Sequence, residues 1–276
     1  MASMLTPEQI RQFHDVGYLR GPRVLDDAEI ELLREETLRV IRDRGRADVA
    51  QPVVCHNMTG KSDTVVWQIV NIWMASAPFK RAITGKEVAS MVAQLTGARE
   101  LRVWHDQIQY KPAGEGGATM WHQDSPYWDI LTPKHQQVTA WIALDDVDLE
   151  NGCMQMVPGS HGWGSDAQPF LHSLTRFEEM QEWVTEWSGH AVRVLPCPVA
   201  RGEVHFHHSL TWHGSNVNRS GRPRRAIAIH YATDQTVFAG TGTHIMRRFV
   251  TSNALEPLSG DAFPVVWPSE RQTVAI

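Results

Sequence analysis

The chain has 276 residues, of which 42% are hydrophobic and 21% are charged, as is typical of a soluble globular protein with one large core. Its formal net charge of -5 and its lack of a long Lys/Arg run argue against a nucleic-acid-binding protein, and no apolar run approaches the roughly 20 residues of a membrane span. The three cysteines are scattered and form no CxxC pair, which predicts buried free thiols rather than disulfides or a zinc site: Cys55, Cys153 and Cys197.

Two helices are predicted near the start of the sequence. The segment 6–19 predicts a helix capped by Thr6, because apolar residues follow at helical spacing. The segment 26–45 begins with acidic residues and predicts a second helix that ends at Gly45. Its apolar stripe would consist of Ile30, Leu33, Leu38 and Ile41. We expect the two helices to form a buttress against the rest of the domain.

The next part of the chain is mixed in character. Residues 46–63 are polar and rich in turn-forming residues, which predicts a loop. Residues 65–74 match neither a helix nor a strand pattern clearly, and we expect them to line a pocket. Residues 85–97 predict a third helix, which Gly97 would cap.

Short β-like runs separated by Gly- and Pro-rich turns then follow, at residues 101–110, 136–144, 190–195, 202–208 and 224–232. The predicted fold class is therefore mainly β with α: one domain whose jelly-roll, cupin-like barrel occupies residues 99–276. The mostly helical buttress would occupy residues 1–98. A helical or irregular insertion is expected near residues 162–190.

The run MWHQDSPYW contains a possible pair of metal ligands. Residues two apart on an extended chain point to the same side, so His122 and Asp124 could bind one ion together. Taken alone the triplet is a weak signal, because 14 histidines produce His-X-Asp by chance, and an exposed loop histidine is the alternative. Spacing alone does not choose the third ligand among His205, His207, His208 and His213.

The residues after His213 favour it as the third ligand. Gly214 and Ser215 form a small-residue turn, and a tight loop then leads into the strand at 224–232. On that strand Arg224 shares a face with two alanines, whose small side chains leave room for a cosubstrate. We therefore predict that Arg224 points inward as a bidentate clamp for a carboxylate and that Arg225 points outward. Two solvated arginines at a hairpin end are the alternative.

Three segments together resemble the phytanoyl-CoA dioxygenase family of iron(II)- and 2-oxoglutarate-dependent oxygenases. They are HQD, NGCMQMVPGSHGWG and HHSLTWHGSNVNRSGRPRRAIAIHY, and the likeness extends over nearly the whole chain. The resemblance implies a double-stranded β-helix with iron(II) held by His122, Asp124 and His213. It also implies that the distal carboxylate of 2-oxoglutarate pairs with Arg224 and receives a hydroxyl from Ser215.

By the same match, Gln109 and Trp141 would line the cosubstrate pocket. The NGC and VPGSHG segments are interpreted as turns, and His161 is expected to be a loop residue that bonds its neighbours rather than a ligand. Four residues are candidates to face the substrate: Gln68, Trp73, Tyr127 and Trp128.

Three protein ligands on one face of an octahedral ion leave two positions for 2-oxoglutarate and one for O2. The predicted reaction is hydroxylation of an unactivated C–H bond of a small organic acid or natural product, with release of succinate and CO2. Because the resemblance places a carboxylate, Asp124, where halogenating relatives have a small residue, no halogenase activity is expected.

Two alternatives remain at this point, and both are testable. A cupin-like metalloenzyme that does not use 2-oxoglutarate would have no need of an inward Arg224, and a non-enzymatic barrel would have no need of buried ligands. The expected partner is a small-molecule substrate, with no nucleic acid and no membrane. Lacking a basic leader and a recognisable address signal, the sequence predicts a cytoplasmic protein, whereas the oligomeric state and the substrate cannot be read from it.

Overall fold

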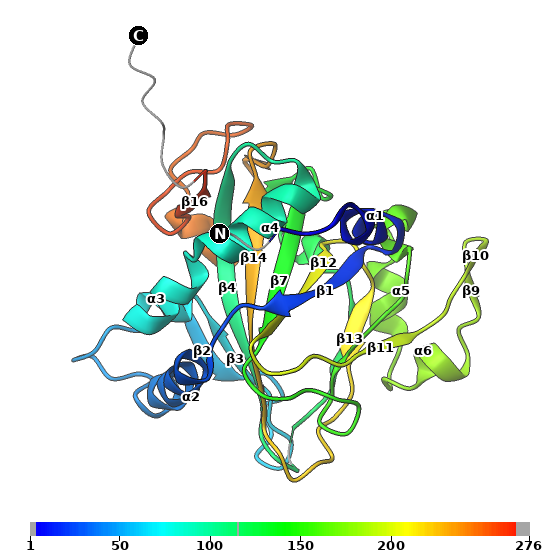
Figure 1. Ribbon diagram of the computed structural model, residues 1–276, viewed down its shortest axis with the longest axis horizontal. Coiled ribbons are helices and arrows are strands. Elements are labelled where there is room, and N and C mark those ends of the chain that lie inside the picture. The colour runs from blue at the N-terminus through cyan, green and yellow to red at the C-terminus, as the bar shows by residue number, and fades with distance from the viewer. Residues whose placement is uncertain (1–3, 115, 269–276) are drawn as a thin grey trace.

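The computed structural model describes residues 4–114 and 116–268, and two antiparallel sheets dominate it (Figure 1). The large sheet has the strand order β1-β12-β7-β14-β4-β3-β2, with β16 also paired to β4. Its strands are β1 (Tyr18–Arg23), β2 (Val54–Asn57), β3 (Trp67–Val70), β4 (Leu101–Lys111), β7 (Gln137–Ala143), β12 (Glu203–His208), β14 (Arg224–Thr233) and β16 (Val265–Trp267).

The smaller sheet has the order β11-β8-β13-β5. Its strands are β5 (Thr119–His122), β8 (Met154–Met156), β11 (Leu195–Cys197) and β13 (His213–Ser215). Two further strand pairs lie outside these sheets: β6 (Leu131–Thr132) with β15 (Val237–Phe238), and β9 (Glu186–Trp187) with β10 (His190–Ala191). The structure is thus mainly β, as predicted.

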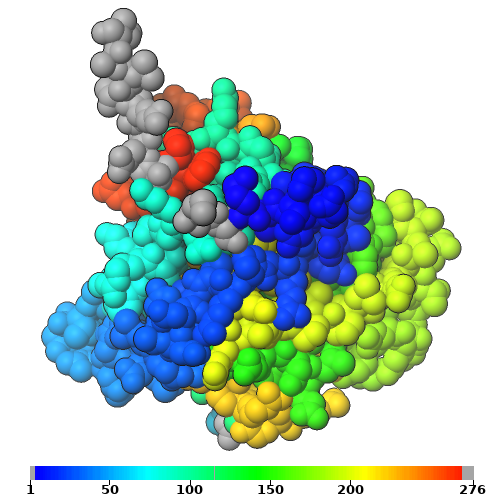
Figure 2. Space-filling view, viewed as in Figure 1, coloured from blue at the N-terminus to red at the C-terminus, as the bar shows by residue number. Residues whose placement is uncertain are grey.

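The α-helices are α1 (Pro7–Val16), α2 (Asp27–Arg42), α3 (Ala77–Ile83), α4 (Lys86–Thr96), α5 (Gln168–Ser173) and α6 (Glu179–Glu182). The 3-10 turns are η1 (Ile72–Met74), η2 (Ser125–Tyr127), η3 (Ser160–Trp163) and η4 (Ile245–Phe249). Helices α1 to α4 supply much of the core that covers one face of the large sheet. In the space-filling view the N-terminal residues spread across this side, and the insertion lies at the right (Figure 2).

All three predicted helices are present. The prediction was wrong about the second one, in its end and in its buried row. Thr6 caps α1 through a capping box, and Gly97 ends α4 in a left-handed conformation, both as predicted. Helix α2, however, ends at Arg42 and not at Gly45. Its buried row is Ile30, Leu33, Thr37 and Val40, whereas Leu38 is 46% exposed. The row follows the 3.6-residue period more closely than the predicted stripe did.

Short elements account for the other differences. Strand β2 lies within residues 46–63, which were predicted to be a loop, and helix α3 was not predicted. The predicted strand at 190–195 is two separate strands, because β10 pairs with β9 whereas β11 pairs with β8. Elements this short carry too few residues to show a period, so only their tertiary partners define them.

Alternation along the strands decides which side chains face the site. On β14, Ile227, Ile229 and Tyr231 belong to the core beneath the helices. Ala226 and Ala228 instead pack with residues of the smaller sheet, so the two sheets lie face to face. The segment in which an insertion was expected, near residues 162–190, carries α5, α6 and the β9–β10 pair. The three cysteines are free, and two of them are buried.

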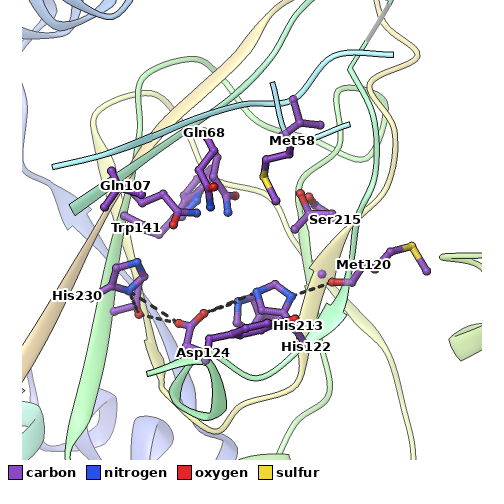
Figure 3. A pocket seen from close by; sticks show the side chains of 18 of the residues that line it. Met58, Gln68, Gln107, Met120, His122, Asp124, Trp141, His213, Ser215 and His230 are labelled. Carbon is purple, nitrogen blue, oxygen red and sulfur yellow. Dashed lines mark hydrogen bonds and ion pairs between the residues drawn. The ribbon is translucent and has the colours of Figure 1, made fainter. Parts of the chain in front are cut away.

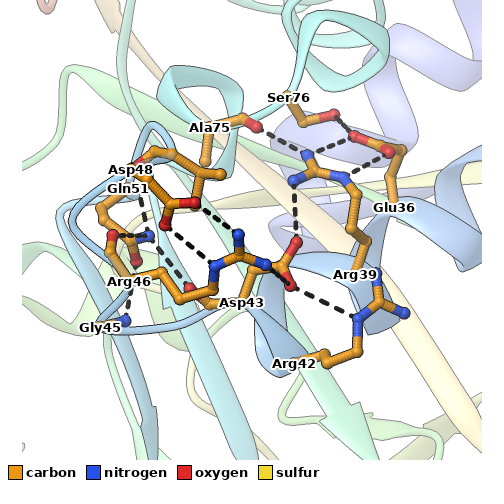
Figure 4. A network of polar contacts seen from close by, with 11 residues as sticks. Glu36, Arg39, Arg42, Asp43, Gly45, Arg46, Asp48, Gln51, Ala75 and Ser76 are labelled. Atoms are coloured by element: carbon orange, nitrogen blue, oxygen red, sulfur yellow. Dashed lines mark hydrogen bonds and ion pairs between the residues drawn. The ribbon is translucent and has the colours of Figure 1, made fainter.

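A polar network fixes α2 against the segment that follows η1 (Figure 4). Arg39 donates to the carbonyl of Ala75 at 2.7 Å and to the carboxylate of Glu36, which also accepts from Ser76 Oγ at 2.6 Å. These side chains are partly buried, and each of the bonds is charge-assisted. The network holds η1, and with it the end of β3. Within the described residues no helix is long and apolar enough to cross a membrane.

A buried histidine next to the site predicts acid sensitivity. His205 is 2% exposed, and burial, with smaller effects from His207 and Arg20, lowers its pKa to about 3 from the ordinary 6.5. The unfolded chain therefore binds a proton below pH 6.5 that the folded protein takes up only near pH 3, so stability falls as the pH falls through this window. From about pH 7.5 to 5.5 we expect this histidine to remove about 1.4 kcal/mol.

Urea unfolding of the wild type and of His205→Gln at both pH values measures this effect. The variant should lose about 1.4 kcal/mol less than the wild type over the same interval, because other titrating groups contribute equally to both proteins. An identical pH dependence in the two proteins would show that His205 does not titrate as its burial requires.

Candidate metal and cosubstrate site

Three side chains converge between the two sheets in an arrangement that could hold a metal ion. His122 is the last residue of β5 and His213 the first of β13, and these two residues are direct cross-strand partners. Their Nε2 atoms lie 3.6 and 3.5 Å from Asp124 Oδ1, and the three ligand atoms all lie within 4.8 Å of one another (Figure 3). Of the four histidines considered as third ligand, the structure thus places His213 beside the pair.

Asp124 reaches this position in a different way from the predicted one. Strand β5 ends at His122, and Asp124 has a helical backbone conformation (φ -72°, ψ -53°) at the start of η2. The two side chains therefore do not share the face of one extended strand. The turn directs the carboxylate back toward the imidazoles, while strand pairing supplies the second imidazole.

Backbone carbonyls fix the tautomers of both histidines. Nδ1 of His122 lies 2.7 Å from the carbonyl of Met120, and Nδ1 of His213 lies 2.9 Å from the carbonyl of Thr211. A carbonyl only accepts, so each Nδ1 carries the proton and each Nε2 presents its lone pair toward Asp124. Burial, followed by the neighbouring His122, lowers the pKa of His213 well below its ordinary value and favours the neutral, ligating form.

The second carboxylate oxygen of Asp124 is already engaged. Oδ2 accepts from Thr139 Oγ1 at 2.9 Å and from His207 Nε2 at 3.2 Å. Thr139 Oγ1 in turn lies 2.7 Å from His230 Nδ1. Although burial raises the pKa of Asp124, the imidazoles of His213, His122 and His207 together bring it well below the ordinary value. The carboxylate is therefore ionised, with Oδ1 free to face an ion.

Loss of the Thr139 hydroxyl should loosen this arrangement. Thr139→Val keeps the shape of the side chain but removes the donor to Asp124, and removal of a partner of this kind typically lowers metal affinity about 10- to 100-fold. Titration with Fe(II) under anaerobic conditions measures the change. Thr37→Val is the matched control, because the Thr37 hydroxyl is also buried but bonds the Leu33 carbonyl within α2. Equal iron affinity in the two variants would contradict the assigned contact.

Arg224 lies inside the molecule, as the alternation of β14 predicts, and is completely buried. Its Nε and Nη2 donate to the carbonyl of Gly152 at 3.2 and 3.1 Å, and Nη2 also donates to Ser215 Oγ at 3.0 Å. One edge of the guanidinium is thus occupied, so the bidentate clamp that was predicted is not available. Arg225 points outward, where it forms two side-chain bonds with Asp145 at 2.9 and 2.8 Å.

Buried polar atoms without a partner mark the space beside the triad. They include Nη1 of Arg224, Nε1 of Trp141 and Oγ1 of Thr119, and ring nitrogens of His105 and His207 are also without a partner. Buried donors left unpaired are costly, so such a group signals a missing acceptor. The guanidinium also lies over the Trp141 ring at 5.4 Å. A dicarboxylic 2-oxo acid supplies the acceptors that these groups lack, so the residues present fit 2-oxoglutarate.

A cavity of about 630 Å³ opens over the triad. The predicted site residues that line it, besides the triad, are Gln68, Gln109, Tyr127, Trp128, Trp141 and Ser215. Arg224 and Trp73 are not among its lining residues. His161 bonds the carbonyl of His14 at 3.1 Å, as expected, but it lies in η3 rather than in a loop.

Sequence reasoning missed several residues of this cavity. Thr139 and His230 were not proposed for any role, and His207 was considered only as a ligand. The available signal was alternation: His207 follows His205 by two positions on β12, and His230 follows Arg224 by six on β14. Alternation shows on which face of the strand a side chain lies, but not which side chains of other strands it contacts.

Comparisons with known proteins agree with this geometry. The family model described as "Phytanoyl-CoA dioxygenase (PhyH)" matches residues 13–226. The peroxisomal phytanoyl-CoA dioxygenase of Bos taurus is 27% identical over 83% of this chain and 69% of its own. The ectoine dioxygenase of Halomonas elongata is 30% identical over 80% of this chain and 68% of its own.

Among solved structures, the non-heme alpha-ketoglutarate-dependent carbocyclase SnoK from nogalamycin biosynthesis is similar, with a TM-score of 0.76 and 25% identity. The likeness covers 96% of this chain and 98% of that chain. The EctD protein of S. alaskensis has a TM-score of 0.65 at 19% identity, over 86% of this chain and 80% of that chain, which is a likeness of fold. The chain therefore belongs to the phytanoyl-CoA dioxygenase family and is an iron(II)- and 2-oxoglutarate-dependent oxygenase.

Proposed function

We propose that His122, Asp124 and His213 hold the iron(II) ion, and that Arg224 and Ser215 hold the distal carboxylate of 2-oxoglutarate. The observation that carries this assignment is the triad of fixed ligand atoms beside a buried guanidinium with a free Nη1. We further propose that the two facing sheets form a double-stranded β-helix within one domain spanning the chain. The packing of Ala226 and Ala228 against the smaller sheet supports that topology.

Each protein group then has a defined task. The carbonyls behind His122 and His213 keep their Nε2 lone pairs directed at the ion, and Thr139 with His207 keeps Asp124 Oδ1 in place. Trp141 and Gln109 line the space for 2-oxoglutarate. Bound iron with 2-oxoglutarate and O2 supplies an oxidant for C–H bonds and releases succinate and CO2.

Anaerobic addition of Fe(II) and 2-oxoglutarate tests the assignment without knowledge of the substrate. Chelation of iron by the 2-oxo acid gives a weak visible charge-transfer band, which we expect in the wild type. A metal-loaded protein without this band would overturn the proposed ligand and cosubstrate residues. It would also favour a cupin-like metalloenzyme that does not use 2-oxoglutarate.

We propose that the substrate is an uncharged natural product rather than an acid or a CoA thioester. Among the described residues that line the cavity there is no Lys or Arg, and the single carboxylate is Asp124. The polar groups opposite the triad are neutral amides, Gln68 and Gln107, each of which both donates and accepts (Figure 3). A phosphate or carboxylate of the substrate would find no Lys or Arg there and only histidine rings as possible partners.

The rim of the cavity supports the same substrate class. Met58, Tyr127 and Ile245 are 46%, 50% and 42% exposed and line the cavity from three separate segments. An exposed apolar rim over a neutral polar interior suits a largely apolar molecule that carries hydroxyl or carbonyl groups. The likeness to SnoK, a protein of nogalamycin biosynthesis, agrees with such a substrate.

Succinate formation with two probes tests this substrate class. The loaded enzyme should turn over 2-oxoglutarate faster in the presence of a nogalamycin-type anthracycline than in the presence of phytanoyl-CoA at equal concentration. Faster succinate formation with phytanoyl-CoA would contradict the proposal, while leaving the iron and cosubstrate assignment intact.

A further inference from the structure

Two buried cations face each other at one end of the cosubstrate space. Arg224 on β14 and Lys111 on β4 are direct cross-strand partners, and both are completely buried. Neither forms an ion pair with any residue that the structure describes. Like charges directly opposite each other repel, and an unpaired buried charge is costly. Burial and the nearby guanidinium lower the pKa of Lys111 well below its ordinary value, whereas three hydrogen bonds from Nζ to oxygen acceptors favour its charged form.

The ammonium group of Lys111 is fully occupied by protein acceptors. Nζ donates to Ser215 Oγ at 2.7 Å, to the Ser215 carbonyl at 3.1 Å and to the Asn216 carbonyl at 2.7 Å. These three acceptors match the three protons of a charged ammonium and leave none for a ligand. Lys111 can therefore influence a bound carboxylate only through its charge and through Ser215.

The hydroxyl of Ser215 is oriented by these contacts. Ser215 Oγ accepts from Lys111 and also from Arg224 Nη2 at 3.0 Å, which uses both of its lone pairs. Its single proton is then left to be donated. Because Ser215 lines the cavity next to the free Nη1 of Arg224, the hydroxyl and the guanidinium present two donors that together suit one carboxylate.

Packing seals this cluster from water. A Cβ added at Gly116 would lie 2.5 Å from the Cβ of Lys111 and 2.7 Å from the Cβ of Asn218, so only glycine lets that loop lie so close to the lysine. Asn218 Nδ2 also donates to the carbonyls of Lys111 and Pro112, at 3.3 and 2.9 Å. The lysine thus stays in a region of low dielectric, where its charge acts strongly.

We propose that Lys111 is a positioning residue that makes the site selective for 2-oxo dicarboxylates over 2-oxo monocarboxylates. It holds the proton of Ser215 toward the distal carboxylate and adds a second positive charge beside Arg224. A bound dicarboxylate supplies the negative charge that these two cations lack. The proposal rests on the proposed roles of Arg224 and Ser215 in cosubstrate binding.

The test compares two 2-oxo acids of the same chain length. The dissociation constants of 2-oxoglutarate and 2-oxopentanoate, which has a methyl group in place of the distal carboxylate, are measured from the visible band of the anaerobic Fe(II) protein. Lys111→Met should weaken binding of 2-oxoglutarate by about tenfold or more. The same variant should change the dissociation constant of 2-oxopentanoate less than about twofold, since that acid has no distal carboxylate.

Lys134→Met is the matched control. Lys134 is partly buried and donates to the carbonyl of Trp128 rather than to Ser215, so its loss should leave both constants unchanged. Ser215→Ala should reproduce the selective loss, and its combination with Lys111→Met should be less than additive, because one residue acts through the other. Ser215→Ala carries the same comparison if Lys111→Met does not fold.

The possible results separate this proposal from the proposed function. Equal weakening of both acids by Lys111→Met, or an unchanged 2-oxoglutarate constant, overturns the role of Lys111. If the effects of Lys111→Met and Ser215→Ala on 2-oxoglutarate affinity are fully additive in the double variant, Lys111 does not act through the Ser215 hydroxyl. Absence of the band in the wild type would instead overturn the assigned cosubstrate site itself.

Discussion

Arg224→Ala is expected to abolish the visible band that Fe(II) and 2-oxoglutarate produce with the wild-type protein, whereas Arg225→Ala should retain it. The two arginines are adjacent in sequence but lie on opposite faces of β14. Arg224 is completely buried with Nη1 unpartnered, and Arg225 is paired with Asp145. Loss of a buried charged partner typically costs several kcal/mol, so the affinity for 2-oxoglutarate should fall about 100-fold or more.

The stability of the two variants should show the reverse order. Arg225→Ala removes the two side-chain bonds from Arg225 to Asp145, which is 6% exposed and keeps only its Arg34 ion pair and a backbone N–H bond. This should lower the free energy of unfolding of the metal-free protein. Arg224→Ala removes a buried cation that has no ion pair and should cost less. Denaturant unfolding without ligands, together with the band titration, measures both effects. If the visible band is retained in Arg224→Ala, or is lost equally in Arg225→Ala, the assignment of Arg224 to the cosubstrate site is wrong.

The contrast between these arginines shows how much could be predicted from the sequence. Strand β14 is long, paired along its whole length with β4 and from Ala226 to Ala232 with β7, so its alternation assigns the inner and outer faces correctly. The three proposed ligand positions could likewise be named from motifs and from the family resemblance, whereas the direct pairing of His122 with His213 is seen only in the structure. Long strands and local motifs are what a sequence shows most clearly.

The surroundings of the triad could not be predicted in the same way. Thr139, His207 and His230 meet at Asp124 only because β7, β12 and β14 are neighbours in the sheet, although they are far apart along the chain. The same holds for Lys111, whose partner across the strand is Arg224. A pattern gives the face of each side chain, but strand order and register decide which side chains touch.

The local conformation at Asp124 is a further case. The spacing of His-X-Asp suggested a common strand face, yet the chain turns after His122 and the carboxylate approaches from η2. The prediction named three residues that the structure brings together, but its reason for the position of Asp124 was partly wrong. Any conformation that brings Oδ1 to the two Nε2 atoms meets the same chemical need.

Removal of this carboxylate should have the largest effect on the metal. Asp124→Ala takes away the single anionic group among the proposed ligands and leaves His207 and Thr139 without their acceptor. Loss of an indirect partner already weakens metal binding about 10- to 100-fold, so loss of a ligand should weaken Fe(II) binding about 100-fold or more. Equilibrium dialysis with metal analysis, and succinate formation in air, measure the two consequences.

Asp129→Ala is the control for this experiment. Asp129 is an exposed carboxylate close in sequence that accepts from the backbone of Thr243 and His244, so its loss should leave iron binding unchanged. Iron bound as tightly by Asp124→Ala as by Asp129→Ala would contradict the proposed ligand set. In the proposed ligand set Asp124 would fill the position that a halide would need, so the wild type should form no chlorinated product in chloride buffer. Chlorination by the wild type would show that Asp124 does not stay bound during turnover.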